Sequence, residues 1–406
     1  MEDRIVLRQF YYHSRSKENM YRILSVALIA LFALSLGCTS IADYGEEAGD
    51  QIAIREPYPL AFHTSFYSQG ISDITFTLTN YGTDERIIRA SAWYDEYSSK
   101  AITTVEIPPD ETVELDVMIV LNEEKVRAIT TTTLFNLAWV VEEWDGDYWQ
   151  IIEEGTAPIE VYPMDTMVWE ISDGEGGSID TTEYIAVFVT PQAPAVRELL
   201  VASKEYVDPA YDPMYETLGL SRTLAGYQFG DLPDEAWYIH TGLHAKAVYN
   251  ALRYTYDVRY LDMTVSFGTQ GYVQRVNTPE ESLRSTSANC VDGSVLFASA
   301  LEAMGIDAYI ISLPTHAYVA WKHDPSPANT PGYENPDGLP LLNPDDLTAL
   351  ETTMIGDYEF GEAVAYGNEQ LGKDWDLFND FENPDAKEYR LIDIGYARDE
   401  GIYPLR

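Results

Sequence analysis

The hydrophobic pattern of this 406-residue chain changes its period once, near the glycine-rich stretch 172–178, and this change limits the folds open to it. Before the stretch, apolar and polar residues alternate in short segments such as 73–81, 103–107 and 112–121. Such alternation is typical of strands with one buried face. After the stretch, apolar residues recur every three or four positions, which is typical of helices. The chain is therefore predicted to hold an all-β part followed by a mixed part.

Residues 57–165 carry strand after strand with Pro, Gly and Asp between them. Asp145-Gly146, for example, lies between two aromatic runs and reads as a hairpin turn. This regular spacing predicts an immunoglobulin-like β-sandwich. Residues 180–406 are predicted to form an α+β domain, with helices over Pro194–Val207 and Pro233–Tyr256, a further helix from Pro279, and a buried strand over Glu183–Thr190.

The first 38 residues have the composition of an export signal. Basic residues precede fifteen uncharged, mostly apolar residues, Ile23–Gly37, and Cys38 follows. A bilayer span usually needs ~20 residues, so this length favours a secretory signal. Ser35-Leu36-Gly37-Cys38 is similar to a lipobox, although Ser35 stands where a leucine is usual. Cys38 is the predicted lipidation site, and an uncleaved helical anchor is the alternative.

Either reading of residues 1–38 tethers the chain to a membrane and places its bulk on the extracytoplasmic face. Residues 39–56 are polar, acidic and small, and we expect them to form a linker between the anchor and the sandwich. The chain holds 67 acidic and 25 basic residues, a net charge of −42. A field of this sign repels phosphate backbones, so we expect no nucleic-acid partner. The two cysteines are too few for a fold held together by disulfides. We expect the protein to be a monomer.

Cys290 is the first chemically informative residue. Asn289 is a good helix cap, an apolar stripe follows, and Gly305 ends the pattern, so Cys290 is predicted at the first position of a close-packed helix. Unpaired amides and the positive end of the helix dipole favour thiolate over thiol there. The alternative is a buried structural cysteine.

His316 stands 26 residues after Cys290 and opens the predicted strand 316–321. A strand lies before it at 308–313, so the histidine can face back toward the helix start. A cysteine nucleophile needs a nearby base, and imidazole is the usual one. The two residues therefore form a candidate nucleophile–base pair.

Three blocks of sequence resemble the core of transglutaminase-like cysteine proteins. They are Asn289-Cys290-Val291-Asp292-Gly293, the alanine-rich helix that ends in Ala303-Met304-Gly305, and Thr315-His316-Ala317-Tyr318-Val319. The segments 360–363 and 392–402 look like the tail of microbial members, so the resemblance covers about 183–406. It implies a helix that bears the cysteine, packed on an antiparallel sheet, and a Cys–His–Asp triad in that chain order.

The resemblance makes Glu351 the third member, because it stands where the family usually has an aspartate in an Asp-Pro-Thr motif. Its role would be to accept a hydrogen bond from the imidazole and to fix its tautomer. Asp324 and Asp393 are alternatives for this role. The Cys290 amide and the Gln274 side chain are candidate oxyanion donors, and an ordinary surface glutamine is the other interpretation of Gln274.

His240 and His244 stand four residues apart and share a helix face, which would suit a metal pair. No His-Glu-x-x-His pattern or third ligand accompanies them, so we expect no metal and no other cofactor.

The sequence thus predicts a membrane-tethered acyl-transfer enzyme that acts on protein or peptide substrates. Water as the acceptor would make it a peptidase or amidase, and an amine would make it a crosslinking enzyme. The alternative, from a different class, is a catalytically silent envelope protein that keeps the fold and binds or supports other molecules.

Overall fold

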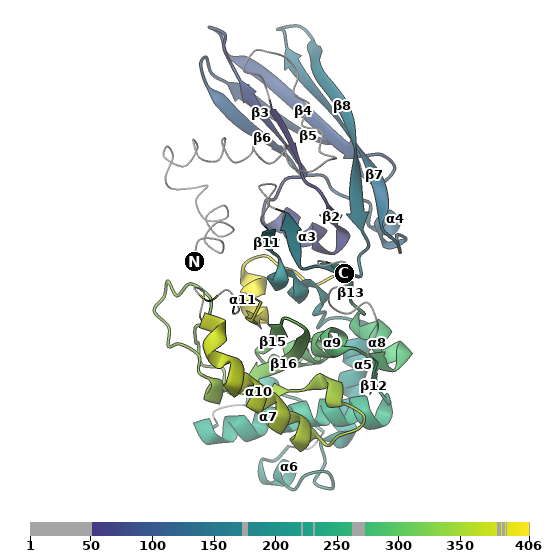
Figure 1. Ribbon diagram of the computed structural model, residues 1–406, viewed down its shortest axis with the longest axis vertical. Helices are drawn as coiled ribbons and strands as arrows, with labels where there is room; N and C mark the ends of the chain where they lie inside the picture. The colour runs from purple at the N-terminus through teal and green to yellow at the C-terminus, as the bar shows by residue number, and fades with distance from the viewer. Residues whose placement is uncertain are drawn as a thin grey trace. The chain divides into compact units, whose positions relative to one another are not determined.

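The computed structural model describes residues 51–172, 178–220, 222–229, 232–261, 273–379 and 388–405, together with Asn383 and Ala386. Over these residues the chain is a mixed α+β protein with several antiparallel sheets. It divides into two compact units between Thr181 and Thr182 (Figure 1). Cys38, the apolar segment before it and residues 173–177 lie outside the described residues. Within the described part, no helix is long and apolar enough to cross a membrane.

Two sheets form most of the first unit. One has the strand order β1-β3-β6 and is antiparallel throughout, and the other has the order β2-β8-β7-β4-β5 and is antiparallel except for the β2–β8 pair. The strands are β1 Gln51–Ile54, β2 Tyr58–Pro59, β3 Ile74–Thr79, β4 Arg86–Tyr94, β5 Ala101–Ile107, β6 Thr112–Val117, β7 Thr133–Trp144 and β8 Trp149–Tyr162. Shorter elements are η1 Leu60–Phe62, α3 His63–Ser68, α4 Glu123–Arg127, β9 Thr166–Val168, β10 Glu170–Ser172 and β11 Ser178–Asp180.

The first strand begins inside the segment that the sequence assigned to an acidic linker, 39–56. Gln51–Ile54 pairs with β3, and residue-by-residue partners run from Gln51 opposite Thr77 to Ile54 opposite Ile74. The alternation of Ile52 and Ile54 with smaller residues gives the segment one apolar side, which packs on the core. The linker, if there is one, lies among residues 39–50, outside the described residues.

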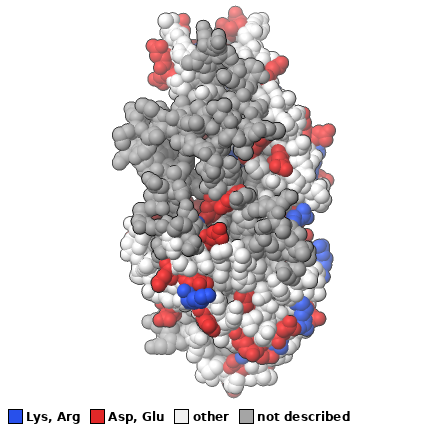
Figure 2. Space-filling view, in the orientation of Figure 1, with Lys and Arg blue, Asp and Glu red and all other residues white. Residues whose placement is uncertain are grey.

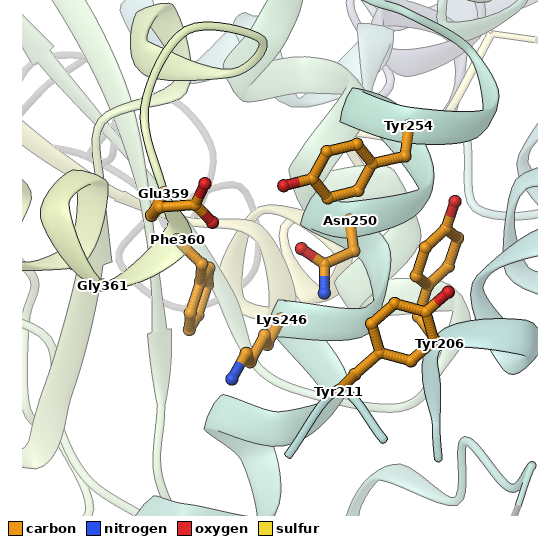
Figure 3. Close-up of a pocket in the computed structure, with 8 residues that line it drawn as sticks. All are labelled: Tyr206, Tyr211, Lys246, Asn250, Tyr254, Glu359, Phe360 and Gly361. Carbon is orange, nitrogen blue, oxygen red and sulfur yellow. The ribbon is translucent and has the colours of Figure 1, made fainter. Parts of the chain in front are cut away.

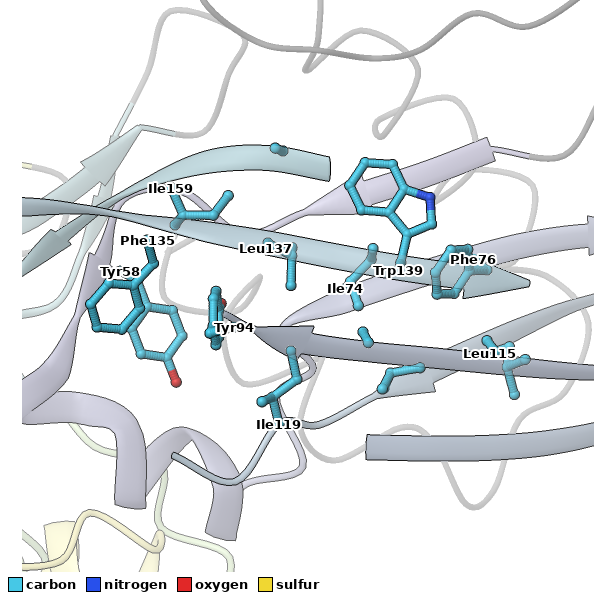
Figure 4. Close-up of a cluster of buried hydrophobic side chains, with 14 of the residues drawn as sticks. Tyr58, Ile74, Phe76, Tyr94, Leu115, Ile119, Phe135, Leu137, Trp139 and Ile159 are labelled. Carbon is cyan, nitrogen blue, oxygen red and sulfur yellow. The ribbon is translucent and has the colours of Figure 1, made fainter. Parts of the chain in front are cut away.

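One apolar core lies between the two sheets of the first unit. It takes Ile74 and Phe76 from β3, and Tyr94, Leu137 and other side chains from the larger sheet (Figure 4). Strand β3 alternates buried and half-buried residues along its whole length, as the sequence period requires. Period-two patterning therefore buries one face of each sheet against the other, and β5 and β6, joined by the turn at Pro108–Glu111, lie in different sheets.

A four-stranded antiparallel sheet is the centre of the second unit. Its order is β17-β16-β15-β18, with the strands β15 Ala308–Leu313, β16 His316–Lys322, β17 Leu347–Leu350 and β18 Arg390–Asp393. The strands expected at 308–313 and 316–321 are confirmed. Three shorter strands accompany this sheet, β12 Arg259–Tyr260, β13 Val273–Arg275 and β14 Ser287–Ala288.

Helices cover both faces of this sheet (Figure 1). Helix α9, Cys290–Ala303, packs on the face that holds Trp321, whose ring lies 6.4 Å from that of Phe297. Helix α10, Phe360–Asp374, places Leu371 on the opposite face, among Tyr318 and Ala320. The remaining helices are α5 Pro194–Ser203, η3 Lys204–Tyr206, α6 Met214–Thr217, η4 Gly226–Phe229, α7 Asp234–Asn250, the π-helical η5 Ala251–Thr255, α8 Pro279–Ser285, η6 Pro344–Asp346, η7 Thr352–Met354, η8 Trp375–Asn379 and α11 Ile394–Asp399.

The buried strand expected over Glu183–Thr190 is wrong, because this segment is the 3-10 helix η2, Thr182–Phe188. A continuous apolar run does not distinguish a buried helix from a buried strand, since it has no period. The helix is held by Arg398, which donates to the carbonyl oxygens of Ala186 and Val189 at 2.9 and 2.8 Å. The same guanidinium forms a two-pronged ion pair with Glu302 of α9, at 3.0 Å in both contacts. Arg398 therefore joins η2, α9 and α11.

Gly293 sets how closely α9 approaches the η7 segment. A Cβ atom at this position would lie 2.9 Å from Oγ1 and 3.0 Å from Cβ of Thr352, closer than ordinary van der Waals contact. We expect Gly293→Ala to push η7 away from the helix and to lower the free energy of unfolding by about 1–3 kcal/mol, the usual cost of overpacking. Urea denaturation measures this change.

Gly372→Ala in α10 is the matched control, because no atom lies within 4 Å of its Cβ position. Alanine favours an exposed helix by up to ~1 kcal/mol, so this variant should be as stable as the parent or more so. Equal stability of the two variants would show that the contact between Gly293 and Thr352 is not tight.

Candidate active site

The first turn of α9 is fixed by a reciprocal cap. The Asn289 side chain accepts a hydrogen bond from the Asp292 amide at 2.9 Å, and the Asp292 carboxylate accepts from the Asn289 amide at 3.4 Å. Asp292 also accepts from the backbone and side-chain nitrogens of Asn277, at 2.8 and 3.0 Å. Burial raises the pKa of Asp292 to about 6, although these hydrogen bonds oppose the rise. Cys290 is therefore the first helical residue, as the sequence predicts.

The segment that carries Glu351 lies directly against this turn. Thr352 fills the space that Gly293 leaves open, and its hydroxyl lies 3.5 Å from the Cys290 carbonyl oxygen. The same carbonyl accepts a shorter hydrogen bond, at 2.7 Å, from Ser294. The end of β17 is thus brought to the start of the helix.

His316 and Glu351 meet across adjacent strands. Val319 of β16 pairs with Leu350 of β17, so the register carried one residue further sets Glu351 opposite Tyr318. His316 is two residues before Tyr318 and therefore on the same side of the strand, as a diagonal neighbour of Glu351. A long side chain reaches a diagonal neighbour, and the His316 Nε2 and Glu351 Oε2 atoms are 2.7 Å apart.

The Glu351 carboxylate is buried, with 2% of the residue exposed, and both of its oxygens have partners. While Oε2 faces the imidazole, Oε1 accepts from the amide and hydroxyl of Thr353 at 3.0 and 2.6 Å. A buried carboxylate held in this way is fixed in position and presents its negative charge to the imidazole.

Cys290 and His316 also interact. Burial lowers the pKa of His316, but a hydrogen bond with the Cys290 side chain and then the bond and charge of Glu351 outweigh it, and the pKa rises to about 10. Because Nε2 faces Glu351, Nδ1 is the ring nitrogen left for the thiol. The imidazole is therefore protonated at neutral pH and joins a sulfur atom to a carboxylate. Only 5% of Cys290 is exposed, while the His316 side chain is 32% exposed.

Gln274 lies on β13 and is buried, with 1% exposed. Its side-chain nitrogen and oxygen have no hydrogen-bond partner within the described part of the chain. Three residues later, Asn277 binds Asp292, so the segment after Gln274 is attached to the first turn of α9. The expectation of a surface glutamine is wrong, because the residue is buried. Its role as an oxyanion donor stays a prediction.

No family model matches this sequence, and no curated protein matches it. Among solved structures, it is similar to native alpha-2-macroglobulin from Escherichia coli, in a structure that spans domain MG7 to the C-terminus. The match has 12% sequence identity and a TM-score of 0.19, and it covers 63% of this chain and 52% of that one. The chain thus spans about half the length of that structure, and a similarity at this TM-score supports no conclusion about fold or function.

The alternative orienting residues lie away from His316. Asp324 accepts from Lys322 Nζ at 3.2 Å and from the Ser326 amide at 2.7 Å. Asp393 accepts from the Thr330 hydroxyl at 2.6 Å and caps α11 through the Tyr396 amide at 2.9 Å. Both carboxylates therefore have structural partners, and of the three candidates Glu351 is the one that contacts the imidazole.

Ring nitrogens of both histidines of α7 contact backbone groups. His240 Nε2 contacts the Gly226 carbonyl at 2.8 Å, and His244 Nδ1 contacts the His240 carbonyl at 2.7 Å. His244 Nε2 accepts from the Ala225 amide at 2.9 Å. Across the residues described, no group of three or more His, Cys, Asp or Glu side chains could hold a metal ion. The predicted lipidation site, Cys38, lies outside these residues.

Sequence reasoning missed two residues of the site, Thr353 and Asn277. Thr353 follows Glu351 by two positions, which is the spacing of a local side-chain-to-backbone turn, but that spacing is common. Asn277 is remote in sequence from Asp292, and nothing local links them.

Removal of the Glu351 charge should release the proton of His316. We expect Glu351→Gln to lower the pKa of His316 from about 10 toward its ordinary value of 6.5, because the carboxylate holds the proton by a hydrogen bond and by charge. The ring C–H signals of His316 in an NMR titration measure this shift. Asp324→Asn is the control and should leave the titration unchanged. A pKa of His316 that stays near 10 in Glu351→Gln and falls in Asp324→Asn would assign the orienting role to Asp324 instead.

The raised pKa of His316 also makes stability depend on pH. The folded protein binds the proton up to about pH 10, while the unfolded chain releases it near 6.5, so this contribution is complete below 6.5 and is lost as the pH rises through 10. Stability in this window should fall by up to about 1.4 kcal/mol per pH unit for one proton. Urea denaturation of the parent and of His316→Gln separates this slope from that of other groups. A slope that survives in His316→Gln would contradict the assignment.

Proposed function

We propose that the second unit is a transglutaminase-like domain whose Cys290, His316 and Glu351 carry out acyl transfer at a peptide or carboxamide carbonyl. The observation that supports this most directly is the connected line of thiol, imidazole and buried carboxylate, with 2.7 Å between His316 Nε2 and Glu351 Oε2. The three residues come from a helix start and two adjacent strands, in the chain order that the resemblance implies. The first unit would be an immunoglobulin-like module that positions this domain.

The proposed reaction starts from the Cys290 sulfur beside the protonated imidazole of His316. The Cys290 sulfur attacks the carbonyl carbon of the substrate, and a tetrahedral oxyanion forms. When the C–N bond breaks, the imidazolium of His316 gives its proton to the leaving amine, and a thioester remains. Neutral His316 then takes a proton from water or from an acceptor amine, whose attack breaks the C–S bond and restores the pair. Water yields a carboxylic acid, and an amine yields a new amide.

Two groups are candidate donors to the oxyanion. The amide of Cys290 lies at the start of a helix, where backbone N–H groups have no partner within the helix. Gln274 has a buried amide with both polar atoms unsatisfied among the described residues, which suits a donor that is used only when substrate is bound. Its segment is attached to the first turn of α9 through Asn277.

Glutamate suits the third position for a geometric reason. Glu351 lies diagonally from His316 across the strand pair, and the additional methylene of a glutamate spans that diagonal. Thr353 then fixes the second carboxylate oxygen. The departure from the aspartate of the family therefore fits the register of β16 and β17.

The N-terminal sequence completes the proposal. Lipidation of Cys38, or retention of residues 1–38 as a helical anchor, would tether the protein to a membrane with both units on the extracytoplasmic face. Asp and Glu side chains recur over the described part of the face shown in Figure 2. A net charge of −42 favours cationic protein or peptide substrates.

A catalytically silent envelope protein is the second candidate, and the burial of Cys290 favours it. With 5% of the residue exposed, a substrate carbonyl reaches the sulfur only if neighbouring groups move. The His316 side chain, 32% exposed, is the more accessible member of the pair. Thiol reactivity therefore distinguishes the two candidates.

Alkylation of Cys290 tests the pair directly. In full-length Cys38→Ser, Cys290 is the only thiol, because the chain has two cysteines. We expect iodoacetamide to react rapidly well below pH 8.5, where free thiols become largely unreactive, because the protonated imidazole of His316 favours the thiolate. Introduction of His316→Ala into the same background should return the reaction to the pH dependence of a free thiol.

Slow alkylation that does not depend on His316 would favour the silent protein. Rapid alkylation in Cys38→Ser and its loss in the double variant would support the enzyme. The fold should be checked by circular dichroism in each variant, so that a loss of reactivity is not confused with unfolding.

A further inference from the structure

A cavity of about 500 Å³ lies in the second unit and does not include the three residues of the candidate active site. Three segments line it (Figure 3): the region around η3, the end of α7 with the π-helical η5, and the start of α10. The lining residues are Tyr206, Tyr211, Lys246, Asn250, Tyr254, Glu359, Phe360 and Gly361. Lys246, Asn250 and Tyr254 are four residues apart in turn, so they share one face of the α7–η5 helix. π-helical turns of this kind occur frequently at functional sites.

Asn250 is the most buried polar side chain among the lining residues of this cavity. Only 6% of the residue is exposed, and its side-chain oxygen and nitrogen are not among the fully buried polar atoms without a partner, so we take them to lie at the wall of the cavity. In Figure 3 the amide is directed into the space between Lys246 and Glu359. An asparagine side chain offers one acceptor and two donor hydrogens, and here they face the open space of the cavity. The amide is therefore placed to bind a polar group that enters the cavity.

The charges of the cavity are balanced. Lys246 Nζ lies 2.7 Å from Asp212 Oδ2, and Glu359 Oε1 lies 2.8 Å from Arg253 Nη1. Each charge that lines the cavity is therefore paired with one of opposite sign, while the ammonium and the carboxylate keep further hydrogen-bonding capacity. A ligand with a net charge would gain little from such a wall and would meet a like charge in it. The wall favours a neutral ligand that is rich in hydrogen-bonding groups.

The tyrosines add flat apolar surface. The rings of Tyr206 and Tyr254 are 6.3 Å apart and inclined by 29°, and Tyr211 lies 5.0 Å from Tyr206. Tyr211 and Tyr254 are 49% and 54% exposed, so part of each ring is accessible to a ligand. Arg253 already lies 4.9 Å from the centre of the Tyr254 ring, which together with Lys246 disfavours a cationic ligand. A tyrosine presents an apolar ring and a polar tip, which suits a molecule with C–H faces and hydroxyl edges.

We propose that this cavity binds a neutral carbohydrate, with one or two sugar rings packed on the tyrosines and their hydroxyl or acetamido groups paired with Asn250, Lys246 and Glu359. Sugars combine the two properties that the wall requires, since their rings carry apolar C–H faces and their edges carry uncharged donors and acceptors. The proposal does not rest on acyl transfer at Cys290, because the cavity shares no residue with that site.

Saturation-transfer difference NMR tests the proposal with the full chain in a polyoxyethylene detergent, which has neither sugar nor ammonium headgroups. The probes are maltotriose, cellotriose and triacetylchitotriose at millimolar concentration. We expect at least one to bind and to be weakened about tenfold or more by Asn250→Leu and by Tyr254→Ala. Tyr366→Ala is the matched control, because Tyr366 is a similarly exposed tyrosine, 48%, on α10 outside the cavity.

Two results would overturn the proposal. The first is that none of the three sugars binds, or that the affinity is the same in the parent and in Tyr254→Ala. The second is that tetramethylammonium binds in their place and is lost in Tyr254→Ala, which would make the cavity an aromatic cation site. Tyr254→Ala removes an exposed ring and keeps the test decisive if Asn250→Leu does not fold.

Discussion

The capped first turn of α9 is the constraint on which the candidate active site depends. Asn289 and Asp292 close the turn on themselves, and Asp292 also holds Asn277. Because residue 293 is a glycine, Thr352 can occupy the space that a side chain at this position would fill. Because the turn fixes both the sulfur and the segment that follows β17, the same few contacts set the position of Glu351 relative to Cys290. The register of β16 and β17 sets its position relative to His316.

A buried carboxylate at this position would be costly without partners. Glu351 meets this requirement by dividing its oxygens between the imidazole and Thr353. The histidine in turn carries a proton that burial alone would remove, since the effect of its two partners exceeds that of desolvation. The site is therefore a small hydrogen-bonded network inside an apolar unit, in which Cys290 and Glu351 together keep the imidazole of His316 protonated.

Elements whose sequence carries a clear local signal could be predicted. The helix from Cys290 to its glycine stop and the strands at 308–313 and 316–321 have caps, stops and periods that are short-range properties. The strand expected at 183–190 failed because a run of apolar residues has no period, and its conformation depends on Arg398 more than 200 positions away. The choice among Glu351, Asp324 and Asp393 depended on the register of β17 against β16, which are separated by a long loop and leave no periodic trace. The cavity around Asn250 draws on three distant segments, and no local pattern indicates it.

Arg398 and β18 come near the end of the second unit in the chain, although their contacts hold its first and central elements together. Its guanidinium joins η2, at the beginning of the second unit, to the far end of the cysteine helix, and the central sheet is completed by β18 only a few residues earlier. The strands and helices that carry Cys290, His316 and Glu351 are therefore all synthesised before the residues that lock them together. The contacts that close the unit therefore form only after its last strand and helix have been made, whatever the order in which the earlier elements fold.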